Sequence, residues 1–381
     1  MNPGTKLPGI GTTIFTVMSK LAADSGAINL SQGFPDFDGP PLLLERVTHY
    51  LNHGFNQYAP MAGVQTLRNE IAAKVGRLYG LEVDPNDEVT VTAGATEAIF
   101  CAITALVRSG DEVIVFDPVY DSYEPAIALA GGHARHLSLK GPDYRPDWDE
   151  VRDAIGPRTR AIIINSPHNP TGSCWRAEDV AALAEVTANR EVYVIADEVY
   201  EHIVFDGLRH ESLLRHPDLY ARSLVVSSFG KTYHTTGWKI GYCVAPPSLT
   251  AELRKVHQFV TFVANTPVQL GLADYMAAEP AYVDGLGAFY QAKRDLFCSM
   301  LAESQFTFTP SAGTYFQMVD YSALSHERDT DLARRLTTHH GVAAIPVSVF
   351  YATPPESRVL RFCFAKDDAT LVSAAEMLCR L

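Results

Sequence analysis

The feature that most constrains the fold of this chain is a series of short apolar runs, rich in β-branched residues, between about residues 89 and 245. Within each run the apolar residues are nearly continuous, which is typical of strands that are buried on both faces. Helical stretches, such as 97–107 and 177–188, separate the runs. Strand and helix repeated in this way predict a mostly parallel α/β sheet that is covered by helices. The predicted strands are 88–92, 112–116, 161–165, 192–196, 224–227 and 239–244.

Roughly the last hundred residues follow a different pattern. A helical stretch at 282–304 precedes several short apolar runs, so we expect a second, smaller α+β domain. A chain of 381 residues also exceeds what one hydrophobic core usually holds, which favours two domains. The short runs are 306–309, 315–319 and 359–364.

The N-terminal forty residues fit neither pattern, and we expect them to pack on the smaller domain or on a partner subunit. We therefore divide the chain into parts by pattern. They are an N-terminal arm with part of the small domain (1–44), a large α/β domain (45–279) and a small C-terminal α+β domain (280–381).

Charge and composition exclude several functions. The net charge is -13 and the isoelectric point is about 5.4, which argues against binding to nucleic acids or to an anionic membrane. The first twenty residues show no signal peptide, and no apolar run approaches the ~20 residues that a membrane helix needs. The six cysteines lack Cys-x-x-Cys spacing, and no other metal-ligand pattern is present. We therefore expect reduced thiols, a cytoplasmic protein and no metal site.

Polar residues cluster where the predicted strands end. Open α/β sheets bind ligands at the carboxyl edge of their strands, so these clusters predict a ligand site there. Packing alone does not explain why polar groups follow so many strands at the same edge. The clusters are 94–97, 117–120, 165–172, 197–200 and 227–231.

Nucleotide-binding alternatives fail on spacing. Gly230, Lys231 and Thr232 look like the end of a phosphate-binding loop, but Val225 stands where that loop needs its first glycine. No Gly-x-Gly-x-x-Gly sequence follows a predicted strand, so a dinucleotide site is not indicated either.

The motifs at these strand ends resemble those of the fold-type I aminotransferases, which use pyridoxal 5'-phosphate (PLP), and the match runs through almost the whole chain. Each motif alone is only moderately specific, but together they stand in the family's order and approximate spacing. The resemblance implies that family's fold: a large domain with a mostly parallel sheet and a smaller α+β domain. The motifs are Asn-Ser-Pro-His-Asn-Pro-Thr-Gly at 165–172, Asp-Glu-Val-Tyr at 197–200, Ser-Ser-Phe-Gly-Lys-Thr at 227–232, Gly-Trp-Lys-Ile-Gly at 237–241 and Arg-Phe-Cys-Phe at 361–364.

The resemblance implies roles for the residues around the cofactor ring. Lys231 would hold PLP as a Schiff base and then shuttle a proton, whereas most lysines are solvated surface charges. Asp197 would keep the pyridine nitrogen protonated, although an aspartate there could also cap a helix. Tyr200 and Asn169 would hydrogen-bond the ring's phenolic oxygen, and a structural role competes for Tyr200 taken alone.

The resemblance also implies a phosphate site and a stacking residue. The phosphate would lie at the start of a helix, where backbone N–H groups favour an anion. Tyr120 would stack on the ring, although a core aromatic is an alternative. Tyr58 would reach the partner's phosphate, which implies a homodimer. The residues expected to hold the phosphate within one chain are Ala95, Thr96, Ser228 and Lys239.

The resemblance implies that Arg361 binds the substrate's α-carboxylate, and an unpaired arginine between apolar neighbours is costly to bury, which favours a functional partner. Asn169 and the backbone of Gly33 would assist it. The side-chain pocket looks apolar and lacks the second arginine of aspartate-type members. Since each buried methylene contributes only ~0.8 kcal/mol, we expect broad specificity for large neutral amino acids. The residues expected to line this pocket are Phe15, Phe34, Tyr58 and Tyr123.

Within the family, the segments 28–39, 57–63 and 227–234 resemble bacterial methionine aminotransferases most, with kynurenine/glutamine transaminases next. This implies ping-pong transfer of the amino group of methionine, or of another large neutral or aromatic amino acid, to a 2-oxo acid through pyridoxamine phosphate. Two alternatives stay open. One is β-elimination from cysteine S-conjugates, and the other is a PLP-binding regulatory module, which the acidic charge does not favour. The sequence does not identify the best amino donor or acceptor.

Overall fold

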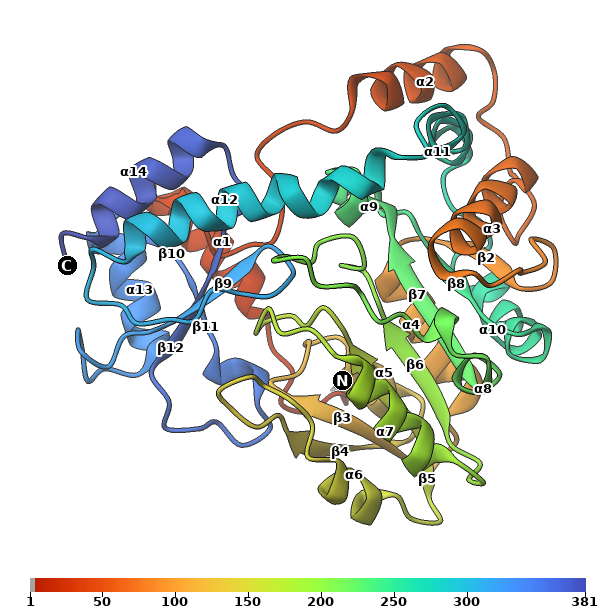
Figure 1. Cartoon of the computed structure of the whole chain (residues 1–381), viewed down its shortest axis with the longest axis horizontal. Helices are drawn as coiled ribbons and strands as arrows, with labels where there is room; N and C mark the ends of the chain where they lie inside the picture. The colour runs from red at the N-terminus through yellow and green to blue at the C-terminus, as the bar shows by residue number, and fades with distance from the viewer. Residues whose placement is uncertain (1–3) are drawn as a thin grey trace.

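The computed structural model describes residues 4–381 as two lobes (Figure 1). The large lobe contains a seven-stranded sheet in the order β2-β8-β7-β6-β5-β3-β4. All neighbouring strands run parallel except β8, which is antiparallel to both of its neighbours. The carboxyl ends of the other strands therefore share one edge with the amino end of β8. The strands are β2 (Val89–Thr92), β3 (Glu112–Asp117), β4 (His133–Ser138), β5 (Thr159–Asn165), β6 (Tyr193–Asp197), β7 (Ser223–Ser228) and β8 (Gly241–Val244).

Helices cover both faces of this sheet, which explains the continuous apolar runs in the sequence. Along β5, Ile162 and Ile164 belong to one hydrophobic core, whereas Ile163 belongs to the core on the opposite face. Helices α3, α7 and α11 contribute to the first core, and α4 and α10 contribute to the second. The helices of this lobe are α2 (Pro41–Asn52), α3 (Gln65–Tyr79), α4 (Ala95–Leu106), α5 (Tyr123–Leu129), α6 (Trp148–Ala154), α7 (Ala177–Thr187), α8 (Pro217–Tyr220), α9 (Phe229–Thr232), α10 (Pro247–Val260) and α11 (Thr266–Ala278).

The small lobe combines an antiparallel sheet in the order β11-β12-β9 with a short parallel pair, β1 and β10. Its strands are β1 (Ile28–Asn29), β9 (Phe316–Asp320), β10 (Val342–Ala343), β11 (Ile345–Pro346) and β12 (Val359–Cys363). Its helices are α1 (Ile14–Ser25), α12 (Leu286–Leu301), α13 (Asp329–His339) and α14 (Asp368–Leu378). Within the described residues of both lobes, short 3₁₀ turns lie at Leu213–Arg215, Thr236–Trp238, Tyr282–Gly285 and Ser348–Phe350.

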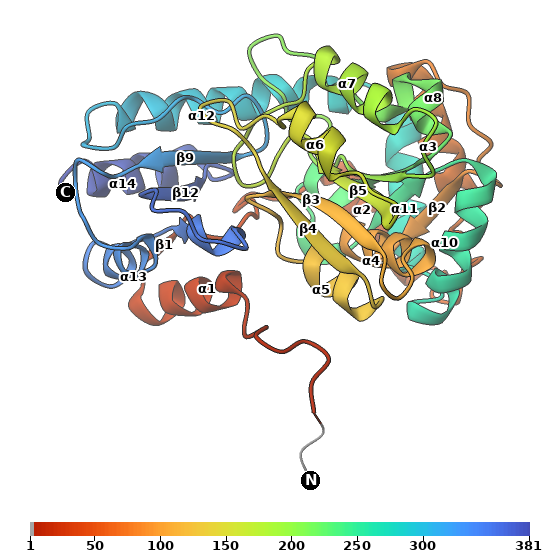
Figure 2. The same cartoon turned by 90° about the horizontal axis from the view of Figure 1, so that it is seen from below.

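The N-terminal segment packs on the small lobe. Helix α1 lies against α13, and Met18 and Leu30 belong to the core of this lobe. The chain that precedes α1 points away from the body of the molecule (Figure 2). One of the two expected packing sites for this segment is thus observed, while the boundaries at residues 44 and 279 stay a prediction.

Some expected elements differ from those observed. Strand β4 was not predicted, because it lies at the edge of the sheet and its residues are mostly polar and partly exposed. The predicted strand at 306–309 is only a single bridge between Thr307 and Asp320. Within residues 4–381, no helix is long and apolar enough to cross a membrane.

Candidate active site

A cavity of about 400 Å³ opens at the carboxyl edge of the large sheet, between the two lobes. All of the predicted site residues line it except Tyr58 and Tyr123. The loops after the strands bring these residues together from distant parts of the sequence. The predicted residues that meet here are Phe15, Gly33, Phe34, Ala95, Thr96, Tyr120, Asn169, Asp197, Tyr200, Ser228, Lys231, Lys239 and Arg361.

Lys231 lies in the short helix α9, directly after β7, and its side chain reaches into the cavity. Its Nζ donates hydrogen bonds to the Tyr315 hydroxyl, at 2.8 Å, and to the Gly33 carbonyl, at 3.2 Å. Burial disfavours the charged ammonium and lowers the pKa of Lys231 to about 8. An amine that is largely surrounded by protein and easily deprotonated is suited to act as a nucleophile and as a proton acceptor.

Asp197 ends strand β6 and is only 5% exposed. Its carboxylate accepts hydrogen bonds from the Tyr123 hydroxyl, at 2.5 Å, and from the Val199 backbone, at 3.3 Å. Burial raises the pKa of Asp197 to about 6, although these hydrogen bonds oppose the change. A cation beside this carboxylate would restore the ionised form, so Asp197 is suited to a protonated ring nitrogen.

Tyr123 does not line the cavity, although the sequence placed it in the substrate's side-chain pocket. The residue is 3% exposed and lies behind Asp197. Its position at the start of α5 turns the ring into the interior, where the hydroxyl orients the Asp197 carboxylate. Tyr58 is likewise absent from the cavity of its own chain. It is 84% exposed, and its ring packs edge-on against Phe262.

The start of helix α4 forms an anion site at one end of the cavity. Gly94 precedes the helix with a φ of +81°, which glycine adopts without strain, and no side chain caps this end. A Cβ atom at Gly94 would come within 3.3 Å of Lys239 Cε, so the Lys239 side chain lies directly over the helix start. Backbone N–H groups, a helix dipole and a lysine at one place favour a phosphate. The hydroxyl-bearing residues that line the cavity near it are Thr96, Ser228 and Thr236.

Arg361 provides a second anion site from strand β12 and is fully buried. Its Nη1 donates to Asn169 Oδ1 at 2.6 Å, and its Nη2 donates to the Ser31 carbonyl at 2.8 Å. Its Nε has no hydrogen-bond partner among residues 4–381, and no carboxylate within that range forms an ion pair with it. Burial lowers the pKa of Arg361 to about 10, and the guanidinium lies 3.8 Å from the centre of the Phe316 ring. An uncompensated buried arginine favours an anionic ligand.

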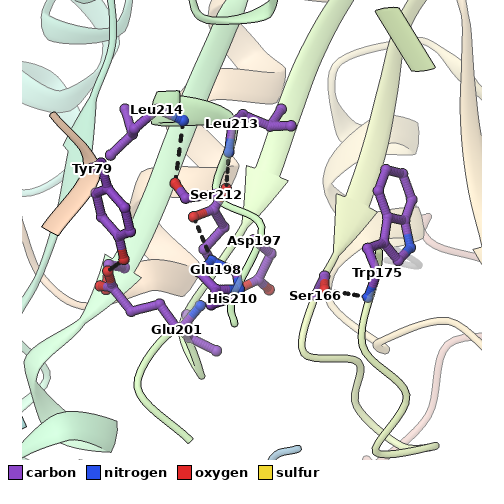
Figure 3. Close-up of polar contacts among 12 residues, drawn as sticks. Tyr79, Ser166, Trp175, Asp197, Glu198, Glu201, His210, Ser212, Leu213 and Leu214 are labelled. Atoms are coloured by element: carbon purple, nitrogen blue, oxygen red, sulfur yellow. Dashed lines mark hydrogen bonds and ion pairs between the residues drawn. The ribbon is translucent and has the colours of Figure 1, made fainter. Parts of the chain in front are cut away.

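Two buried glutamates fix the turn that carries Asp197 and Tyr200 (Figure 3). Glu198 accepts hydrogen bonds from His210, at 2.9 Å, and from the Leu213 backbone, at 3.0 Å. Because these acceptors point away from the cavity, the turn presents Asp197 and Tyr200 to one side and its glutamates to the core.

Glu201 is the second of these glutamates. It pairs with Lys74 at 2.6 Å and also accepts hydrogen bonds from the hydroxyls of Tyr79, Ser227 and Tyr242. Helix α3, strand β7 and strand β8 are thereby tied to the turn. The buried charge of Lys74 is compensated by this one carboxylate, which the Lys74 ammonium stabilises in its ionised form.

Tyr315 and Phe316, which contact Lys231 and Arg361 respectively, were not predicted from the sequence. Phe316 also lines the cavity and packs so closely on Gly33 that a Cβ there would lie 2.5 Å from Phe316 Cζ. In the sequence these residues start an apolar strand, which is indistinguishable from an ordinary core strand. Only the fold shows that they border the site.

The cavity therefore combines a reactive lysine, a buried carboxylate and separate sites for two anions. Residues 25–378 match the pattern of the family described as aminotransferase class I and II. The chain belongs to the class I and II aminotransferases. The family expected from the motifs, and with it the fold, is confirmed.

Individual relatives agree with this assignment. The chain is 56% identical over 379 residues to methionine aminotransferase of Escherichia coli, covering 100% of this chain and 98% of the relative. A solved structure of that E. coli protein superposes with a TM-score of 0.98 and full coverage of both chains. Human kynurenine–oxoglutarate transaminase 1 is 33% identical over 407 residues, covering 98% of this chain and 96% of the relative. N-succinyldiaminopimelate aminotransferase from Mycobacterium tuberculosis is 41% identical, with a TM-score of 0.96 and full coverage of both chains.

Aminotransferases of this class use PLP, so the expected cofactor and the amino acid and 2-oxo acid substrates follow from the family. The cavity fits this cofactor. The anion site at α4 suits a phosphate, and Tyr120 lines the cavity as an aromatic side chain. The carboxylate of Asp197, which also lines the cavity, suits a protonated ring nitrogen. Arg361, with its unpartnered Nε, offers a separate place for a substrate carboxylate.

Proposed function

We propose that this aminotransferase moves the amino group of methionine, and of other large neutral or aromatic amino acids, to a 2-oxo acid by a ping-pong route. The observation that carries this proposal is the charge distribution in the cavity. Among residues 4–381, the basic side chains that line it are Lys231, Lys239 and Arg361. With Lys231 and Lys239 assigned to the cofactor, Arg361 is left for a single carboxylate. The E. coli relative that shares 56% identity is a methionine aminotransferase, which supports the same substrate.

Apolar side chains surround the proposed carboxylate site. Phe15 and Phe316 contact the Arg361 guanidinium with their rings, and Phe34 and the polar Gln32 line the same cavity. A second carboxylate would lose its hydration there without gaining a cation, whereas a thioether or an aromatic ring would bury apolar area. The kynurenine transaminase activity considered above would use the same apolar region.

We assign the cofactor contacts as follows. Lys231 attaches PLP covalently, and Asp197 holds the proton on the ring nitrogen, with Tyr123 orienting its carboxylate. Tyr200 and Asn169 contact the phenolic oxygen, and Tyr120 stacks on the ring. When bound, PLP supplies an electron-accepting ring that allows a proton to be removed from the substrate's α-carbon. The residues assigned to the phosphate are Ala95, Thr96, Ser228 and Lys239.

Arg361 binds the substrate's α-carboxylate, and Asn169 orients the guanidinium through its Oδ1. The Gly33 backbone borders the same region from the arm. With PLP bound, the Lys231 amine would accept the substrate's α-proton and hold it at Nζ for its later return. These roles are compatible with each other because Lys231 and Arg361 enter the cavity from different elements, α9 and β12.

A homodimer completes this proposal, with Tyr58 reaching the partner's phosphate. Its support is a group of exposed apolar side chains at the end of α10 and just after it, next to the exposed Tyr58. Phe259 is 85% exposed, and Phe262 contacts the Tyr58 ring. Apolar patches of this kind mark interaction surfaces.

We also propose a cytoplasmic location, because the six cysteines are all free thiols in the structure.

The test mixes the PLP-loaded enzyme with single amino acids and follows the change in cofactor absorbance. We expect methionine and phenylalanine to react at least roughly tenfold faster than aspartate. The reason is that burial of an apolar side chain stabilises their transition states by more than about 1 kcal/mol relative to that of aspartate. Equal or faster reaction with aspartate contradicts the substrate assignment. Pyruvate released from a cysteine S-conjugate without any added 2-oxo acid would instead reveal β-elimination. Lys231→Ala is the matched variant, and it should lose covalent attachment of PLP.

A further inference from the structure

The two hydrogen bonds of the Lys231 amine have no part in the assignments above. Nζ donates to the Tyr315 hydroxyl at 2.8 Å and to the Gly33 carbonyl at 3.2 Å. The Tyr315 hydroxyl donates its own proton to the same Gly33 carbonyl at 2.8 Å. While the Tyr315 hydroxyl donates its proton, its oxygen keeps lone pairs that accept the hydrogen bond from Lys231.

Both acceptors are held rigidly. Tyr315 is fully buried, and its ring packs edge-on against Tyr200 with centroids 5.0 Å apart. Burial raises the pKa of the Tyr315 hydroxyl well above its ordinary value, so the group stays a neutral phenol. Gly33 packs against Phe316 with no room for a side chain. The carbonyl and the hydroxyl are therefore in place before Lys231 arrives.

These two hydrogen bonds fix the direction of the lone pair on the Lys231 amine. A neutral lysine amine has two N–H groups and one lone pair. Two fixed acceptors, one on Tyr315 and one on Gly33, take both N–H groups. The lone pair must then point to a third direction. Lys231 lines the cavity and Tyr315 does not, so the open side of the amine is the side where substrate binds.

Resting on the assignment of Lys231 as the cofactor lysine, we propose that Tyr315 is a positioning residue, which holds the released Lys231 amine so that its lone pair faces the substrate's α-carbon. In the proton transfer, the C–H bond breaks and a new N–H bond forms on Nζ. The electron pair of the C–H bond goes to the electron-accepting ring. The resulting ammonium keeps its contacts with Tyr315 and Gly33, and its third N–H carries the proton that is later returned.

Tyr315→Phe tests this role, because it removes the hydroxyl and keeps the ring. In the pyridoxamine phosphate form of the enzyme, where the amine is released, we expect the pH midpoint for acylation of Lys231 by acetic anhydride to fall. The reason is that the ammonium loses an acceptor that stabilises it. Peptide mass spectrometry measures the midpoint. We also expect kcat to fall by about 10²-fold with little change in KM, since a misdirected base loses catalytic efficiency.

Tyr290→Phe is the matched control. Its ring lies 5.7 Å from that of Tyr315, and its hydroxyl bonds His234 instead of Lys231. This variant should keep the midpoint and kcat of the parent enzyme. Equal losses in both variants, or an unchanged midpoint and kcat in Tyr315→Phe, would overturn the inference.

A second comparison separates this inference from the proposed function. In Lys231→Ala, added methylamine can act as the base, and Tyr315→Phe should then cause no further loss of rate. A further loss would mean that Tyr315 acts without Lys231, and the positioning role would be wrong. If Lys231→Ala alone keeps covalent PLP, the lysine assignment fails, whatever Tyr315 does.

Discussion

At the scale of single residues, burial sets the charge of the groups that face the cavity. It lowers the pKa of Lys231 to about 8 and raises the pKa of Asp197 to about 6. Near neutral pH, a part of the Lys231 amine is therefore neutral, and most of the Asp197 carboxyl is ionised. Ordinary surface lysines would remain protonated under the same conditions.

The pH dependence of the reaction follows from the Lys231 value. In the pyridoxamine phosphate form, only the neutral amine can accept a proton, so transfer to a 2-oxo acid should speed up as pH rises and level off above about 8. Below that value the rate should change roughly tenfold per pH unit. Rapid mixing at several pH values, with cofactor absorbance as the signal, measures it. A rate that falls between pH 6 and 8 is incompatible with this base.

Arg361→Lys tests the carboxylate site. Lysine keeps the charge but loses the planar pair of donors, and hydrogen bonds to charged groups contribute ~1.5–3 kcal/mol. We therefore expect KM for methionine to rise by roughly 10- to 100-fold. Steady-state kinetics at fixed 2-oxo acid measures this change. Arg334→Lys, on the exposed side of α13, is the control and should behave as the parent enzyme.

At the scale of elements, the turn after β6 has two faces with separate tasks. Asp197 and Tyr200 face the cavity, while Glu198 and Glu201 bond to the core. The position of Asp197 and Tyr200 at the cavity thus depends on an ion pair with helix α3, which is remote from them in sequence.

Glu201→Gln should destabilise the fold, because it leaves the Lys74 charge buried without a counter-charge. Breaking one side of a buried ion pair costs ~3–5 kcal/mol, and we expect a loss of that order in urea unfolding. Replacing Lys74 by Met in the same chain should recover part of it. Glu178→Gln, at a largely exposed surface pair, is the control. Equal stability of the two glutamate variants would contradict this account.

The elements also show what the sequence could predict. The strands at the centre of the sheet were predicted, because burial on both faces leaves continuous apolar runs, but the polar edge strand β4 lacks that signal. Lys231 and Arg361 line the cavity, and the motifs that contain them predicted both as site residues. Tyr315 was not found, because its role depends on where the small lobe meets α9. Tyr123 was misplaced because family resemblance does not specify which way a ring turns.

At the scale of the whole molecule, the exposed surface around Tyr58 predicts association. We expect sedimentation to show a species of twice 41.7 kDa, because burying this surface removes apolar side chains from water. Phe259→Glu should shift the population to single chains and lower activity, since Tyr58 would no longer reach a partner. Met377→Glu, on the exposed side of α14, is the control and should remain associated. A parent enzyme that sediments as single chains would contradict the dimer.

Arg361 joins parts of the molecule that are far apart in the chain. Its guanidinium donates hydrogen bonds to the Ser31 carbonyl in the arm and to Asn169 in the large lobe, while its own strand belongs to the small lobe. A carboxylate that binds Nε at this junction adds a further contact between the arm and the two lobes. Substrate-like acids should therefore raise the melting temperature, with a stabilisation of ~2.7 kcal/mol at a hundred times their Kd. The amino acid that the enzyme converts would then also strengthen the connection between its lobes.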